Sequence, residues 1–227
     1  MSWPATIVLL LLSARSVGQD GPVPLDAPRP QESSAINVNW LYGAYVPKGI
    51  ELKPLNSHQR GQLYLRQTYL TWGIYLKTGM FALGDQAHDS PEPWDQGFAG
   101  YGQRVASRYG QFAIQNTLSA TGNWLLRYEP RYERCRCSGA WPRIGHALFR
   151  NFVTYNQTEH ERRPQIAMYA GALGAGMISS TWKPAQRGDL WIEGYHSVVT
   201  QAVFGSFCNV LGEFAPEIGR LLKRKGD

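Results

Sequence analysis

The sequence is poor in charge and contains none of the common catalytic signatures. Charged residues make up only 18% of its 227 residues, below the roughly 25% of typical soluble domains. It has no Gly-x-Ser-x-Gly elbow, phosphate-binding Walker loop, dinucleotide glycine fingerprint, His-Glu-x-x-His helix or EF-hand loop. These absences argue against serine hydrolases, nucleoside triphosphatases and Rossmann enzymes.

The few residues before the apolar core contain no Lys or Arg, but the N-terminus otherwise resembles an export signal. An apolar core at residues 5–12 precedes a small-x-small pattern at 16–18, which would allow cleavage before Gln19. The apolar core is too short to span a bilayer as a permanent anchor. We therefore expect residues 1–18 to be a signal peptide and the protein to be exported, to the periplasm or cell envelope.

The excess of basic residues indicates the kind of partner to expect. The formal net charge is +6, which favours contact with anionic surfaces. In an exported protein these are anionic membrane surfaces or envelope proteins. Nucleic acid is not expected, because no recognition module is visible.

Composition changes along the chain. Residues 19–54 are rich in proline and polar residues and predict a Pro-rich leader or extended arm. Capping residues and helix-forming runs after this point predict one helical domain over residues 55–227. The expected helices are 57–84, 90–126, 143–152, 164–182 and 189–215, and Pro216 is expected to open a last turn or short helix.

Small residues recur every three or four positions in three of these helices. The stripes are Gly102, Ala106, Gly110, Ala113 and Thr117; Ala167, Gly171 and Gly174; and Ser197, Gly205, Cys208, Gly212 and Ala215. Glycine inside a helix costs up to about 1 kcal/mol, which close approach of helix backbones would offset. We predict a mainly α fold, a single bundle of about four glycine/alanine-packed helices. The same faces would let copies of the chain associate as an oligomer.

The setting of this bundle has two readings. Residues 109–126, 165–182 and 194–212 contain no Asp, Glu, Lys or Arg, and small-residue faces are common between membrane helices. However, each run carries amides or hydroxyls, and the mean hydropathy of the chain is −0.34, whereas inserted helices are usually more apolar. The sequence favours a soluble or membrane-peripheral bundle, with an integral membrane bundle as the alternative.

Residues 128–151, which we call the arginine–cysteine segment, hold the densest chemistry. Six arginines lie in or beside it and are candidates for binding an anion or a lipid headgroup: Arg127, Arg131, Arg134, Arg136, Arg143 and Arg150. Guanidinium groups bind phosphate and carboxylate with two parallel hydrogen bonds. Because Glu129 and Glu133 are interleaved, an internal network of salt bridges is the competing interpretation.

The three cysteines could pair in different ways or remain free thiols. Cys135 and Cys137 are one residue apart, so a bond between them would close a small ring and could serve thiol-redox chemistry. Alternatively, one of them bonds Cys208 and ties the segment to the last helix.

Two carboxylate–histidine pairs share the spacing of metal-binding helices. Asp85 precedes His88, and Glu193 precedes His196, by three residues each. Both pairs lie at predicted helix ends, without the further carboxylates such a site needs, so we expect no metal and no cofactor. A metal-dependent or thiol-redox enzyme is kept as the rival to a binding protein.

The stretches RYERCRCSGAWPRIGHALFRNFVTYN and GQFAIQNTLSA resemble a family of uncharacterised exported bacterial proteins. The resemblance covers most of the chain from about Leu55 onward and implies an envelope location, but no activity or catalytic residue. With the composition, it favours a non-catalytic envelope protein that associates with a membrane surface or with partner proteins.

Overall fold

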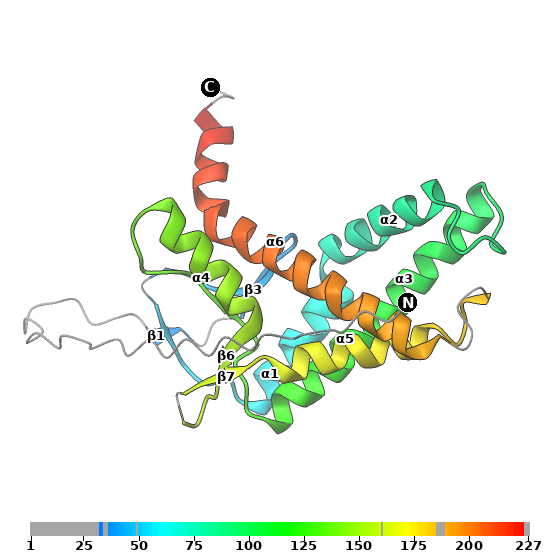
Figure 1. The fold of residues 1–227 in the computed structure, drawn as a ribbon. Helices are drawn as coiled ribbons and strands as arrows, with labels where there is room; N and C mark the ends of the chain where they lie inside the picture. The colour runs from blue at the N-terminus through cyan, green and yellow to red at the C-terminus, as the bar shows by residue number, and fades with distance from the viewer. Residues whose placement is uncertain (1–31, 34–35, 49, 160, 185–188, 225–227) are drawn as a thin grey trace, which may run out of the picture.

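The structure is a computed structural model that describes residues 32–33, 36–48, 50–159, 161–184 and 189–224 (Figure 1). The predicted signal peptide and the first part of the predicted leader lie outside these residues. The described chain is mainly helical with small β-sheets, so the predicted fold class is confirmed at this level.

Six α-helices make up most of the described chain. They are α1 (Ser57–Leu65), α2 (Trp72–Ala87), α3 (Phe98–Leu125), α4 (Ala140–Phe152), α5 (Ile166–Ser179) and α6 (Leu190–Arg224). Helix α3 packs against α2 and α5, and α6 packs against α5 and α4. Figure 1 shows α4 beside the C-terminal half of α6, away from the loops that join α2 to α3 and α5 to α6.

The prediction of one helix over residues 57–84 is wrong. After α1 comes a π-helical turn, η1 (Arg66–Leu70), and Thr71 is extended before α2 begins. The interruption lies where the N-terminal arm crosses: a Cβ at Gly73 would lie 1.3 Å from the carbonyl oxygen of Trp40. The helix is broken by a contact with a distant segment, which local periodicity cannot reveal.

The predicted helix start at Ser90 is also wrong, because α3 begins only at Phe98. Residues 88–97 form a loop around the guanidinium group of Arg104, which is fully buried. Arg104 donates hydrogen bonds to the carbonyl oxygens of Ser90, Trp94 and Asp95 at 2.7–2.9 Å. Because the Arg104 side chain supplies hydrogen-bond donors to these carbonyl groups, the segment does not need helical hydrogen bonds to satisfy them.

The remaining helix boundaries agree with the predictions to within a few residues, except at the C-terminus. There α6 continues through Pro216 to Arg224 instead of ending near residue 215. Proline removes a backbone donor and bends a helix, and α6 turns away from the other helices in its last turns (Figure 1).

Some glycines allow very close helix approach. A Cβ at Gly122 would lie 2.9 Å from the Cβ of Ala167, and one at Gly171 would lie 2.3 Å from the Oγ of Ser119. A Cβ at Gly176 would lie 2.4 Å from the carbonyl oxygen of Glu193. These contacts join α3 to α5 and α5 to α6. In contrast, Gly102 of the predicted α3 stripe has nothing within 4 Å.

The described part of the N-terminal arm is extended and pairs with the body. Strand β2 (Asn37–Asn39) pairs with β3 (Gly43–Val46), which runs parallel to β5 (Tyr132–Glu133) of the arginine–cysteine segment. Strand β1 (Glu32–Ser33) pairs with β4 (Glu51–Leu52), and β6 (Val153–Tyr155) pairs with β7 (Arg162–Pro164). The arm therefore positions the segment.

The described surface is apolar along two helices, whereas polar groups are buried. Exposed large side chains recur every three or four residues on α6 and α2. We call these the apolar stripes: Trp191, Tyr195, Val199, Val203 and Phe207 on α6, and Trp72, Leu76, Met80 and Leu83 on α2. Among the largest fully buried side chains are Arg104, Arg131 and Glu213. In soluble domains large apolar side chains are mostly buried and charged side chains mostly exposed, so this distribution is the opposite of the usual one.

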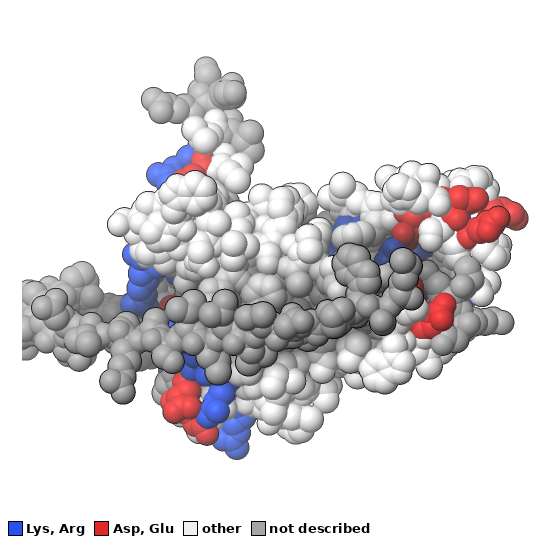
Figure 2. Space-filling model, in the orientation of Figure 1, with Lys and Arg blue, Asp and Glu red and all other residues white. Residues whose placement is uncertain are grey.

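One described helix, α6 over Leu190–Leu221, is long and apolar enough to cross a membrane by length and composition. Helix α5 is apolar but shorter. Figure 2 shows charged side chains gathered toward the two ends of the visible face, with uncharged residues between them.

Candidate functional site

The arginine–cysteine segment is fastened to α6 by one buried carboxylate. Glu213 is 1% exposed and accepts hydrogen bonds from the hydroxyl of Tyr132 at 2.8 Å and the backbone N–H of Cys135 at 3.1 Å. Its other oxygen accepts from Nε of Arg143 at 3.1 Å. Burial and the neighbouring carboxylate of Glu213 raise the pKa of Tyr132, so its hydroxyl stays a donor.

Arg143 joins a second carboxylate one turn further along α6. Its Nη1 donates to Glu217 at 2.9 Å, and this hydrogen bond is the largest cause that lowers the pKa of Glu217. The guanidinium also lies 4.3 Å from the centre of the Phe214 ring. Arg143 is therefore held on several sides by α6.

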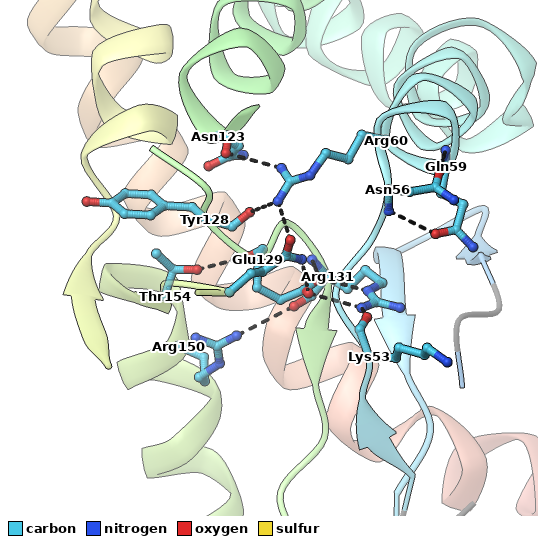
Figure 3. A network of polar contacts seen from close by, with 11 residues as sticks. Lys53, Asn56, Gln59, Arg60, Asn123, Tyr128, Glu129, Arg131, Arg150 and Thr154 are labelled. Carbon is cyan, nitrogen blue, oxygen red and sulfur yellow. Dashed lines mark hydrogen bonds and ion pairs between the residues drawn. The ribbon is translucent and has the colours of Figure 1, made fainter. Parts of the chain in front are cut away.

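A second buried network lies at the base of the segment (Figure 3). Arg131 donates from Nε and Nη2 to the two oxygens of Glu129, at 2.7 and 3.0 Å, and from Nη2 to the carbonyl oxygen of Lys53 at 2.7 Å. Arg60 of α1 donates to the backbone carbonyls of Asn123 and Tyr128. Burial lowers the pKa of Arg60. This network joins the arm, α1, the end of α3 and the segment.

The other two inward arginines bind backbone and aromatic rings. Arg134 donates to the carbonyl of Gly212 at 2.9 Å and stacks 4.6 Å from the centre of the Tyr45 ring. Arg150 donates to the carbonyl of Val153 at 2.6 Å and lies 4.6 Å from the Tyr155 ring. Burial lowers the pKa of Arg150.

The structure thus divides the six candidate arginines into two groups. Four are occupied by internal contacts: Arg131, Arg134, Arg143 and Arg150. Arg127 is exposed and donates to Thr158, and Arg136 is 53% exposed, 3.8 Å from Glu133. Only these two present a guanidinium group to an outside anion, and they are not part of one pocket among the described cavities.

Cys135 and Cys137 are joined in a disulfide bond, and Cys208 is a free thiol on α6. The alternative tie from the segment to Cys208 is therefore not formed, and Glu213 makes that connection instead. Cys135 is 8% exposed, so the bond offers a thiol partner mainly its Cys137 side.

The carboxylate–histidine pairs take part in ion pairs. Asp85 accepts two hydrogen bonds from Arg108, and Glu193 pairs with Lys183 at 3.1 Å. His196 is largely exposed, 3.8 Å from Glu193. Within the described part of the chain, no three potential metal ligands cluster.

Sequence reasoning missed two important residues, Glu213 and Arg104. Each is a charged residue beside or inside a helical stretch with few charges, and that isolation is the signal that could have marked it. The partners could not be found this way, since Glu213 is 70 residues from Arg143.

Comparison with known proteins does not assign this chain to a family or a fold. The bacterial-export resemblance of the arginine–cysteine segment therefore stays a prediction. The chain matches no protein-family model, no curated protein and no solved structure.

Proposed function

We propose that the protein is a non-catalytic cell-envelope protein inserted in a membrane by helices α2, α3, α5 and α6. The observation that carries this proposal is the pair of apolar stripes, which place Trp191, Val203 and Phe207 of α6 and Trp72 and Met80 of α2 at the surface. In water such stripes would be costly, whereas acyl chains solvate them.

Helix lengths support insertion. The charge-free run 109–126 covers the end of α3 and its C-cap Leu126, and the run 194–212 lies within α6. They would be about 27 and 28.5 Å long at 1.5 Å per residue. The hydrocarbon core of a bilayer is about 30 Å thick. Helix α5 is shorter, so its ends would lie near the interface or under the flanking loops.

The polar side chains inside these runs are used between helices. Gln115 of α3 donates to Gln201 of α6, and Gln111 donates to Ser197 at 3.3 Å. Asn209 donates to the carbonyl of Ala147 in α4 at 3.2 Å. Membrane helices use amides and hydroxyls in this way, which answers the objection that the runs are too polar.

Aromatic residues lie near both ends of the charge-free runs. Trp191 begins α6 and is 71% exposed, while Trp124 ends α3 and Trp141 begins α4, also exposed. Tryptophan is enriched at membrane interfaces. Helix α4 adds exposed Leu148, Phe149 and Phe152, an apolar face suited to lying at the interface.

The finer fold prediction becomes part of this proposal. Four helices would cross the membrane in alternating directions, with α5 held against α3 and α6 through Gly122, Gly171 and Gly176. An even number of crossings would put the arm, the arginine–cysteine segment and the C-terminal turn on one side. The disulfide and the predicted signal peptide favour the oxidising, exported side, where Arg127 and Arg136 would face lipid headgroups.

Fractionation tests the proposal. The full chain, expressed with its own leader, is separated into soluble and membrane fractions, and the membranes are washed at alkaline pH in carbonate. We expect the protein to stay in the membrane pellet and to be released by detergent. Release by carbonate alone would support surface association, and recovery in the soluble fraction would contradict both membrane readings.

A further inference from the structure

Lys77 of α2 is a cation without an acidic partner in the middle of the helices. Its Nζ lies 4.2 Å from the centre of the Phe204 ring and 5.2 Å from that of Phe112. Among the described residues, none forms a hydrogen bond or ion pair with it. Lys77 is half-buried, and an ammonium group drawn partly out of water without a counter-charge is costly, so its presence points to a use.

Two cavities share Lys77 in their lining. A cavity of about 250 Å³ extends from Lys77 toward the arm and the arginine–cysteine segment, reaching Arg131 and Arg150. A second, of about 470 Å³, extends toward the opposite end and reaches Lys183 and Glu193. The larger one is within the usual size of ligand pockets, about 300–1,000 Å³.

The larger cavity combines apolar rings with polar groups. Phe81, Phe112 and Phe204 supply phenyl rings, and Gln111, Gln115, Gln201, Ser197 and Thr200 supply amides and hydroxyls. The amide oxygen of Gln111 is buried without a partner among the described residues. A half-turn of this amide exchanges its donor and acceptor ends, so it can exchange roles with Ser197, to which its nitrogen donates at 3.3 Å.

The charge balance of the lining indicates one negative charge. Arg108 is matched by Asp85 and Lys183 by Glu193, so the two other cations of the larger cavity are neutralised. Lys77 remains as a surplus of one positive charge beside phenyl rings. A small dianion would lack a second free cation here, whereas an organic monoanion matches both the charge and the rings.

We propose that the larger cavity binds a monocarboxylate. The carboxylate group of this ligand would lie on Nζ of Lys77, and its apolar part would lie against Phe81, Phe112 and Phe204. The carboxylate could come from a short acid in solution or from the headgroup of a fatty acid. The chemistry at the amine is the same. This site does not depend on membrane insertion, because the cavity is bounded by packed helices in either setting.

Calorimetric titration tests the site. The purified full chain, in nanodiscs of zwitterionic lipid, is titrated with sodium acetate and with sodium decanoate against empty nanodiscs; a chain that purifies without detergent is titrated in buffer. We expect saturable binding of one equivalent of at least one of them. Acetate binding alone identifies a soluble acid, decanoate binding alone a lipid-derived one, and binding of both a site open to either.

Matched variants complete the test. Lys77→Met keeps the length of the side chain but removes the charge, and should weaken binding about tenfold or more, since hydrogen bonds to charged groups have that strength. Lys48→Met, at an exposed loop position, should bind like wild type. If Lys77→Met fails to fold, the lysines of the wild type are ¹³C-methylated and followed by NMR. The signal of Lys77 is assigned as the one that Lys77→Arg removes, and it should shift when the wild type is titrated. No saturable binding, equal binding by Lys77→Met, or an unshifted signal would overturn the proposal.

Discussion

The arginine–cysteine segment and the packed helices bury polar groups in opposite ways. In the segment, charges of both signs are enclosed and matched, with Arg131 on Glu129 and Arg143 on Glu213. Between the helices, the buried groups are mostly neutral amides and hydroxyls, and the apolar side chains point outward. The comparison shows that Arg131 and Arg143 of the segment are used in internal ion pairs. Under the proposed insertion, affinity for a membrane would come from the apolar stripes of α2 and α6.

The largest effect should come from the centre of the charged region. Glu213→Gln removes the buried charge to which Tyr132, Cys135 and Arg143 all donate, and breaking a buried ion pair costs about 3–5 kcal/mol. We expect a loss of that size in the free energy of unfolding, measured with denaturant. Glu217→Gln is the control, since Glu217 is 38% exposed and should cost less than about 1 kcal/mol. Equal losses would show that Glu213 does not fasten the segment.

A charge on an apolar stripe tests the other region. Val203 is 67% exposed on α6, and an arginine near the middle of a membrane helix costs about 2.5–3.5 kcal/mol on insertion scales. We expect Val203→Arg to lower the carbonate-resistant fraction strongly. Leu221→Arg, beyond Pro216 and also exposed, should leave it unchanged. If neither variant changes that fraction, the stripe faces water.

Two glycine variants separate tight packing from open helix surface. Gly171→Ala places a Cβ 2.3 Å from the Oγ of Ser119, and overpacking of this kind costs about 1–3 kcal/mol. Gly84→Ala in α2 meets nothing within 4 Å and should stabilise the helix by about 0.5–1 kcal/mol. Opposite signs in thermal unfolding are expected. A stabilising Gly171→Ala would mean that α3 and α5 do not touch there.

The smallest effect concerns pH. Burial and Glu213 raise the pKa of Tyr132 above its ordinary value of 10.0, so the folded state keeps a proton that the unfolded state releases. Stability should therefore fall as the pH rises above about 10. Tyr132→Phe should remove that part of the slope, measured as unfolding midpoints between about pH 8 and 11. An unchanged slope would place the Tyr132 hydroxyl in water.

The sequence predicts the helical class because periodicity and capping are local. Asn56 caps α1, and the charge-free runs fall within α3, α5 and α6 or their adjoining turns. The sequence fails where distant residues decide the outcome. The first predicted helix is interrupted at residues 66–71, next to the contact of Trp40 with Gly73, and Arg104 holds residues 88–97 as a loop.

The candidate site shows the same limit. Residue types alone identify the arginine–cysteine segment, and the interleaved Glu129 suggests that some arginines pair internally. They do not reveal that Glu213 lies beneath the segment, since Glu213 and Arg143 are 70 residues apart in the chain. Nor do they reveal that Lys77 lacks a partner, because that depends on what α3 and α6 bring to it.

The most direct measurement of the central claim is what surrounds Val203. A spin label is placed by Val203→Cys in a Cys208→Ser background, and its collisions with oxygen, which concentrates in lipid, and with a water-soluble nickel chelate are measured in reconstituted vesicles. Insertion predicts frequent collisions with oxygen and few with the chelate at residue 203, and the reverse at a label on Leu221. Ready access of the chelate to residue 203 would contradict insertion of α6.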